Sequence, residues 1–172
     1  IHVLGWNLNK RLDPQWPNLG FISFDISTNP SISPKQVLQE LEGDINELVA
    51  DGHNVALVGD SIGGYYASYM ASKYRLPVVL INPLVKPHDS LLLASLLEDK
   101  QRDLNLVQGE LQEMETAIAE PDSVMVMLQK GDKIQDYEDA RDYYISCNQV
   151  ILNNGSHQFD NLKGWIPVIK NF

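Results

Sequence analysis

The sequence predicts an α/β fold in which a mostly parallel β-sheet lies between two layers of helices, as a three-layer α/β/α sandwich. Short apolar, β-branched runs of strand length alternate with amphipathic stretches, as at residues 55–58 and 78–81. These runs are almost continuously apolar, which indicates strands that are covered on both faces. A chain of 172 residues, 44% hydrophobic and 21% charged, is in the range of one compact domain. We expect residues 1–172 to form a single domain.

Six segments have the composition and length of strands, and each is bounded by turn-forming residues or by the start of an amphipathic stretch. They are residues 1–4, 20–25, 54–59, 77–82, 123–129 and 148–152.

A long helix is predicted between the second and third strands. Ser33, Pro34 and Gln36 form the pattern of an N-cap, a first-turn proline and a capping-box partner. Apolar residues then recur at helical spacing until Gly52, which is placed to end the helix. Further helices are expected over residues 61–74, 136–146 and 161–171, the last weakened or bent by Pro167.

The segment between the fourth and fifth strands, about residues 84–121, is too long for a simple connection. It contains the apolar run 91–97, which is rich in leucine, and we expect it to form helices of its own. Loops of this length in compact domains are usually functional, so we predict a helical lid. Extra packing with no part in binding is the alternative that the sequence leaves open.

The charge and cysteine content exclude several classes of partner. The formal net charge is −10, from 13 Lys and Arg against 23 Asp and Glu, and no basic cluster offsets it. Nucleic acids and anionic membrane surfaces are therefore not expected partners. The single cysteine, Cys147, cannot form an internal disulfide, and no Cys/His grouping has zinc-site spacing. With no apolar stretch of membrane-spanning length and no visible leader, we expect a reducing, cytoplasmic setting.

The strongest motif is G-x-S-x-G at residues 59–63, with Ser61 at its centre. It directly follows an apolar strand and opens a helix, which is the context that a nucleophile elbow requires. A serine on this sharp turn is strained, and Gly59 and Gly63 allow the strand and helix to approach. A tight turn without catalytic function is the alternative for the motif alone. The upstream strand, the additional Gly64 and the small residues of the helix start favour a nucleophile.

A serine nucleophile needs a general base and a third group that orients the base. After an elbow of this kind, the acid and then the histidine follow on loops after later strands. Of the four histidines, His2 and His53 precede the motif and His88 lies in the long insertion. His157 lies in a loop of small residues after the last predicted strand, so we predict that it is the base. Taken in isolation, it would be interpreted as a solvated surface histidine.

Two aspartates are candidates for the orienting acid. Asp132 directly follows the fifth strand, within Gly131-Asp132. Asp136 opens the next helix, where it is expected to act as the N-cap. We therefore prefer Asp132.

The oxyanion of an acyl-transfer intermediate needs N–H donors. The Ile62 N–H lies at a helix N-terminus and is one candidate. The second donor is expected in the loop after the first strand, where Gly5 permits close backbone approach and Trp6 N–H is the candidate. An aromatic wall of the pocket and a core position are the other roles open to Trp6.

Four segments together resemble the YqiA/YcfP-type family of small bacterial esterases within the α/β-hydrolases. They are residues 58–67 (VGDSIGGYYA), 76–83 (LPVVLINP), 131–137 (GDKIQDY) and 155–159 (GSHQF), so that the resemblance extends from about residue 54 to the end. It implies an α/β-hydrolase fold and an esterase or thioesterase, with Ser61, Asp132 and His157 at the triad positions of the family. The family usually has His-Gly-Phe after its first strand, where this chain has Leu4-Gly5-Trp6. This difference predicts a divergent member with altered substrate choice.

The predicted reaction is hydrolysis of a carboxylic ester or thioester through an acyl-enzyme, with Ser61 attacking as His157 takes its proton. It requires no metal and no organic cofactor. The expected substrate is a small acyl ester or thioester with an apolar acyl group, and the acidic surface disfavours strongly anionic substrates such as acyl-CoA. A peptidase or carbon–carbon hydrolase with the same triad, and a non-catalytic hydrolase-like binding protein, are the alternatives.

Overall fold

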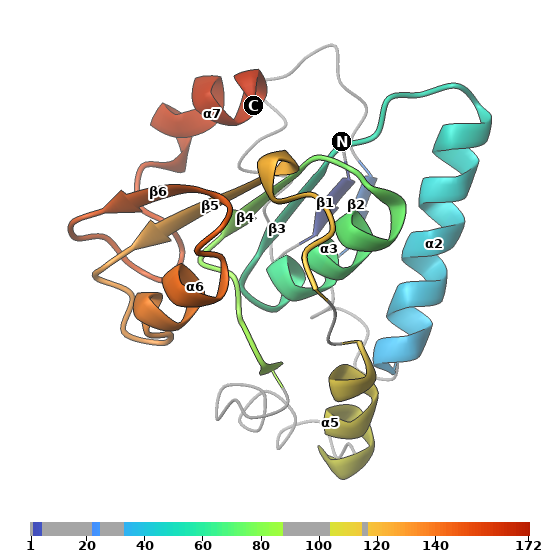
Figure 1. Ribbon diagram of the computed structural model, residues 1–172, viewed down its shortest axis with the longest axis horizontal. Helices are drawn as coiled ribbons and strands as arrows, with labels where there is room; N and C mark the ends of the chain where they lie inside the picture. Colours follow the sequence, from blue (N-terminus) through green and yellow to red (C-terminus); the bar gives the residue numbers. More distant parts are fainter. Residues whose placement is uncertain (1, 5–21, 25–32, 88–103, 115–116) are drawn as a thin grey trace.

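The computed structural model describes residues 2–4, 22–24, 33–87, 104–114 and 117–172 (Figure 1). Their elements follow one another in the predicted alternation of strands and helices. In chain order they are β1 (His2–Leu4), β2 (Ile22–Phe24), α2 (Pro34–Ala50), β3 (Leu57–Asp60), α3 (Ser61–Tyr74), β4 (Val78–Ile81), α5 (Leu104–Glu113), the 3-10 helix η3 (Pro121–Ser123), β5 (Val124–Gln129), α6 (Tyr137–Tyr143), β6 (Asn148–Leu152) and α7 (Leu162–Asn171).

The six strands form one sheet in the order β2-β1-β3-β4-β5-β6, and every pairing between neighbours is parallel. Each strand coincides with one of the six predicted segments, although β3 begins at Leu57 rather than at residue 54. The pairing with β4 explains this start, because its first matched pair is Leu57 with Val78. The carboxyl ends of β3, β4, β5 and β6 therefore lie at one edge of the sheet, where functional loops gather in parallel sheets.

The sheet has helices on both faces, as predicted. Along β4, Val78 and Leu80 belong to the larger core cluster, whereas Val79 and Ile81 belong to a second cluster. This alternation follows from the two-residue period of a strand. The larger cluster includes residues of α2, α3, α5 and α6, and the second includes residues of α7. Figure 1 shows α7 on one side of the sheet and α2 and α3 on the other.

The local signals for the helices are confirmed. At the start of α2, the Ser33 hydroxyl accepts from Gln36 N at 3.3 Å, and the Gln36 side chain accepts from Ser33 N at 2.8 Å. This is the predicted capping box. Pro167 lies inside α7 without ending it, because the helix continues to Asn171.

The described α-helix of the predicted lid is α5, and it packs into the main core. Val107, Leu111 and Met114 are buried in the larger cluster. Tyr65 of α3 donates its hydroxyl to the Leu111 carbonyl at 2.9 Å. The burial of α5 agrees with the packing role that the sequence left open, and a part in binding stays a prediction. Residues 88–103, which contain the leucine-rich run, lie outside the described residues, and a lid there stays a prediction.

Candidate active site

Ser61 lies where β3 passes directly into α3, and its backbone is strained. Its φ of 50° is in the left-handed region, which a residue with a side chain adopts at a cost. A Cβ atom on Gly59 would lie 2.5 Å from the Gly63 carbonyl oxygen and 2.8 Å from Ala67 Cβ. Only glycine at position 59 therefore allows this approach of strand and helix, and the turn has the geometry of the expected elbow.

The chain after β4 braces the same turn. Leu84 N donates to the Ser61 carbonyl oxygen at 2.9 Å. A Cβ atom on Gly64 would lie 2.8 Å from Pro83 Cβ, so this glycine allows α3 and the segment after β4 to touch. The sequence marked Gly64 only as an additional small residue of the motif, because its neighbour comes from another strand.

The structure brings the three predicted triad residues together. His157 Nε2 lies 2.9 Å from Ser61 Oγ, and His157 Nδ1 lies 2.7 Å from Asp132 Oδ2. An ionised carboxylate can only accept, so Nδ1 carries a proton, and in the neutral imidazole Nε2 is left to accept the proton of the serine hydroxyl. The side chains of His157 and Asp132 are 17% and 2% exposed, so water hardly competes for the contact between Nδ1 and Asp132.

Asp132 is held as a carboxylate by its surroundings. Its Oδ1 accepts from the backbone N–H groups of Ile134 at 2.8 Å and Gln135 at 3.0 Å. Burial by itself raises the pKa of Asp132, but the hydrogen bond from His157, these two backbone bonds and the attraction of His157 outweigh it. The pKa of Asp132 therefore lies below its ordinary value of 3.8, and the group keeps the charge that orients the imidazole.

Asp136, the rejected alternative for the acid, has the role that its position predicted. It is the N-cap of α6, and its Oδ1 accepts from Glu138 N at 3.0 Å. A capping carboxylate is committed to the helix start, which agrees with the preference for Asp132.

Two buried amides, which the sequence did not single out, hold the loop that carries His157. Asn82, after β4, donates from Nδ2 to the carbonyl oxygens of Ser156 at 3.0 Å and His157 at 2.9 Å. Its Oδ1 accepts from Gln129 N, at the end of β5, at 3.0 Å. Asn82 is only 3% exposed, so its bonds connect three chain segments away from water.

Gln129 completes this network from the neighbouring strand. Its side-chain oxygen accepts from Ser156 N at 3.0 Å and Asp160 N at 2.8 Å, and its Nε2 donates to the Asp160 carbonyl at 3.1 Å. Both residues have a signal in the sequence, because each amide stands at the carboxyl end of an apolar strand. In the fold, these strand ends lie at the edge of the sheet where the loops of Asp132 and His157 meet. Without the fold, nothing shows what such an amide binds.

The structure describes only one of the two expected oxyanion donors. Ile62 is in the first turn of α3, and N–H groups there have no acceptor within the helix. The Ile62 N–H lies next to Ser61 in the chain, and its role as an oxyanion donor stays a prediction. Gly5 and Trp6 lie outside the described residues, so the second donor stays a prediction.

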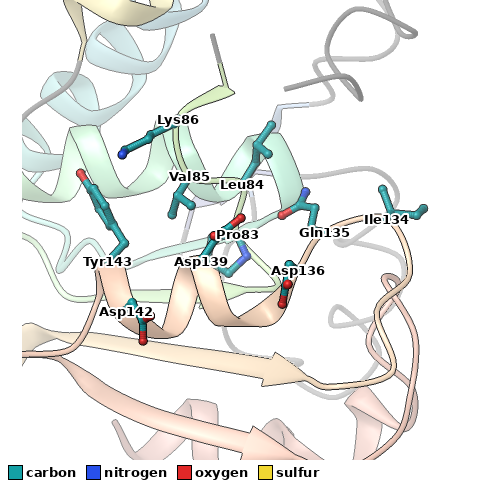
Figure 2. A pocket seen from close by; sticks show the side chains of 10 residues that line it. All are labelled: Pro83, Leu84, Val85, Lys86, Ile134, Gln135, Asp136, Asp139, Asp142 and Tyr143. Atoms are coloured by element: carbon teal, nitrogen blue, oxygen red, sulfur yellow. The ribbon is translucent and has the colours of Figure 1, made fainter. Parts of the chain in front are cut away.

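Gln135 makes a contact that the sequence gave no signal for. Its Nε2 lies 3.3 Å from Ser61 Oγ, so a second side chain besides that of His157 contacts this oxygen, and it comes from the loop after Asp132. Gln135 also lines a pocket of about 460 Å³ (Figure 2). The other lining residues come from the segment after β4 and from α6 with the loop before it: Pro83, Leu84, Val85, Lys86, Ile134, Asp136, Asp139, Asp142 and Tyr143.

Two features are absent from the described residues. None of the helices there is long and apolar enough to cross a bilayer. In the same part of the chain, no group of three or more His, Cys, Asp or Glu residues is arranged to hold a metal ion.

Several solved structures with similar folds are hydrolases by name. Est1E from Butyrivibrio proteoclasticus, with ferulic acid bound, has a TM-score of 0.70 and 13% identity over 99% of this chain and 86% of that one. The acetyl ester-xyloside bifunctional hydrolase from Caldicellulosiruptor lactoaceticus has a TM-score of 0.69 and 12% identity, covering 99% and 80%. MGS-MChE2, an alpha/beta hydrolase enzyme from a lagoon-sediment metagenome of Mar Chica, Morocco, has a TM-score of 0.64 and 14% identity, covering 99% and 88%. At these identities the similarity shows the α/β-hydrolase fold.

The family comparison covers nearly the whole chain. The model of the family described as "Uncharacterised protein family (UPF0227)" matches residues 8–172. The match begins well before residue 54, where the resemblance in the sequence begins, so the first part of the chain shares the family pattern as well. The chain belongs to UPF0227, the YqiA/YcfP family, and has the α/β-hydrolase fold.

Proposed function

We propose that this protein is a serine hydrolase that cleaves carboxylic esters through an acyl-enzyme on Ser61. The observation that carries the proposal is the continuous hydrogen-bonded chain from Ser61 Oγ through His157 to Asp132, with contacts of 2.9 and 2.7 Å. The strained φ of Ser61 adds support, because such backbone strain clusters at functional sites. The esterase and hydrolase names of the structural neighbours agree with it.

The triad residues and the oxyanion donors each have a defined task in acylation, the first step. Ser61 Oγ attacks the substrate carbonyl carbon while its proton passes to His157 Nε2, and the carbonyl electron pair moves onto the substrate oxygen. The Ile62 N–H, together with Trp6 N–H, stabilises that oxyanion. Asp132 stabilises the imidazolium. His157 then returns the proton to the leaving alcohol as the tetrahedral intermediate collapses.

Water resolves the acyl-enzyme by the same route in reverse. His157 takes a proton from the water, which attacks the acyl carbon, and Ser61 Oγ leaves and regains its proton. Thioesters are open to the same chemistry, with a thiol as leaving group. Because the chain is strongly acidic, with a formal net charge of −10, neutral esters are favoured over strongly anionic substrates.

The test combines turnover with covalent labelling. We expect the wild-type protein to hydrolyse p-nitrophenyl esters in a series of increasing acyl length, and matched thioesters show whether sulfur leaving groups are accepted. A fluorophosphonate probe should label the wild type on Ser61. Ser61→Ala should lose both turnover and labelling, whereas Ser72→Ala, in the same helix, should keep both.

The alternative is a non-catalytic binding protein with a hydrolase fold. It predicts a folded wild type, as judged by circular dichroism and a cooperative melt, that neither reacts with the probe nor turns over any ester. That result would contradict the proposed function.

A further inference from the structure

We propose that Gln135 is a further catalytic residue, whose side-chain N–H stabilises the negative charge that develops on Ser61 Oγ as the proton moves to His157. The inference rests on the proposed serine hydrolase function and adds a residue to its site. No such role follows from the three triad residues, which supply a nucleophile, a base and an orienting acid but no donor to Oγ itself.

With His157 as a neutral imidazole, the directions of the hydrogen bonds at Ser61 and His157 agree with this role. Asp132 accepts the proton on His157 Nδ1, so His157 Nε2 accepts the single proton of the Ser61 hydroxyl. Ser61 Oγ then has only lone pairs left to offer to other groups. An amide nitrogen donates and does not accept, so the contact of 3.3 Å from Gln135 Nε2 is a donation to Oγ.

The length of this contact indicates a bond that is weak in the resting protein. At 3.3 Å it exceeds the usual N–H···O distance of about 2.9–3.0 Å. Hydrogen bonds to an ionised oxygen are shorter and stronger than those to a neutral one. The donor is therefore placed to bind the developing alkoxide better than the resting hydroxyl, which is the condition for lowering a barrier.

The position of Gln135 is determined by the same loop that holds the acid. Its backbone N–H donates to Asp132 Oδ1 at 3.0 Å, while its side chain reaches Ser61. Figure 2 shows the amide of Gln135 directed from the loop before α6 toward Leu84 and the start of α3. One residue thus connects the orienting acid and the nucleophile, so that the amide needs little reorganisation during the reaction.

The proposed role applies to both halves of the reaction. In acylation the Oγ–carbon bond forms as the proton goes to His157, and Gln135 keeps its own protons throughout. In deacylation the Oγ–carbon bond breaks, Oγ carries developing negative charge again, and the proton returns to it from His157. The second lone pair of Oγ remains available to accept from Gln135 while the first one bonds to carbon.

A role in substrate binding alone makes a different prediction. Gln135 lines the pocket of about 460 Å³, so a lost contact with a substrate bound there would raise KM and leave kcat unchanged. Loss of a donor that acts only in the transition state lowers kcat and kcat/KM together and leaves KM unchanged.

The experiment compares Gln135→Met and Gln135→Glu with the wild type and with Lys133→Ala, an exposed position in the same loop. Gln135→Met keeps length and removes the donor. We expect kcat, kcat/KM and the rate of fluorophosphonate labelling to fall roughly 10- to 100-fold, with KM within about twofold. Gln135→Glu places an acceptor beside the developing charge and should lose more. Lys133→Ala should behave as the wild type.

The outcomes separate this inference from the function on which it rests. If the wild type is neither labelled nor active, the proposed function fails. If the wild type is active and Ser61→Ala is not, but Gln135→Met keeps kcat and labelling rate within about twofold or changes only KM, the role of Gln135 is overturned. If Gln135→Met does not fold, Gln135→Glu decides by the same criteria, because it has nearly the same shape as glutamine.

Discussion

The side-chain amide of Asn82 donates to the carbonyl oxygen of His157 at 2.9 Å across 75 residues of sequence. The parallel sheet makes this contact possible, because the carboxyl ends of β4 and β6 lie at the same edge. Gln129, at the end of the strand between them, accepts from Ser156 N and Asp160 N with its side chain. The imidazole is therefore positioned from two neighbouring strands as well as by Asp132.

Asn82→Gly is expected to lower hydrolysis without unfolding the protein. Asn82 has a φ of 39°, which glycine adopts without strain, so the change removes only the side-chain hydrogen bonds. Leaving the partly buried carbonyls of Ser156 and His157 without these donors should cost about 1–3 kcal/mol of unfolding free energy. We expect kcat to fall as well, measured with a p-nitrophenyl ester beside urea unfolding.

The matched control is Asn148→Gly. Asn148 also donates from its side chain to two backbone carbonyls, those of Asp122 and Val124, but at the amino-terminal start of β6. Asn148→Gly should leave kcat unchanged. If both glycine variants lower kcat equally, the special position of Asn82 is contradicted.

Asp132→Asn should lose activity and change the pH dependence of stability. Because the pKa of Asp132 is lowered in the folded protein, its carboxylate stabilises the fold above pH 3.8, and this contribution is lost as the pH falls through the lower, folded-state value. The wild type should therefore exceed Asp132→Asn in unfolding free energy at pH 7, with a difference that shrinks below about pH 4. Urea unfolding at pH 7, 5, 4 and 3 measures it.

The activity of Asp132→Asn provides a second readout. An amide in place of the carboxylate favours the wrong histidine tautomer, and kcat should fall by about 10³- to 10⁴-fold. Asp51→Asn, at an exposed position after α2, should keep full activity. A stability difference that is constant from pH 7 to pH 3 would show that the charge of Asp132 does not contribute.

Gly155→Ala is expected to destabilise the loop before His157. Gly155 has a φ of 91°, and an added Cβ would collide with the side chain of Gln129. Gly52→Ala is the control, since Gly52 has a φ of 79° and no described atom lies within 4 Å of the Cβ position. Gly52→Ala should cost about 1–2 kcal/mol from the backbone alone. Gly155→Ala should cost more and should also reduce kcat. Equal costs in thermal or urea unfolding would show that the loop moves aside.

Leu111→Ala tests whether α5 belongs to the core. Leu111 is 1% exposed, so its truncation should lower the unfolding free energy by about 2–5 kcal/mol. Leu106, in the same helix, is 57% exposed, and Leu106→Ala should change it by less than about 0.5 kcal/mol. A helix that opens as part of a mobile lid would instead give two small changes of similar size.

The order and type of the elements followed from the sequence because their signals are local. The apolar run at β4, the capping box at Ser33 and the apolar spacing of α2 each act within a few residues. Ser61 was found in the same way, since its strand–turn–helix setting is contiguous. His157 was predicted by its place in chain order, and Asp132 by comparison with the capping residue Asp136.

Other features depended on contacts between distant parts of the chain, and only the tertiary structure decided them. The sequence left a lid and extra packing open for α5, whose burial against α2 and α3 is a property of the folded core. Asn82, Gln129 and Gln135 are ordinary amides until the sheet brings their loops together at one edge. A hydrogen-bond partner 74 residues away, as Ser61 is from Gln135, leaves no periodic or local trace in the sequence. The sequence by itself thus determined the elements, the turn at Ser61 and the chain order of the candidate triad, whereas the fold decided which uncharged side chains hold the His157 loop and contact Ser61.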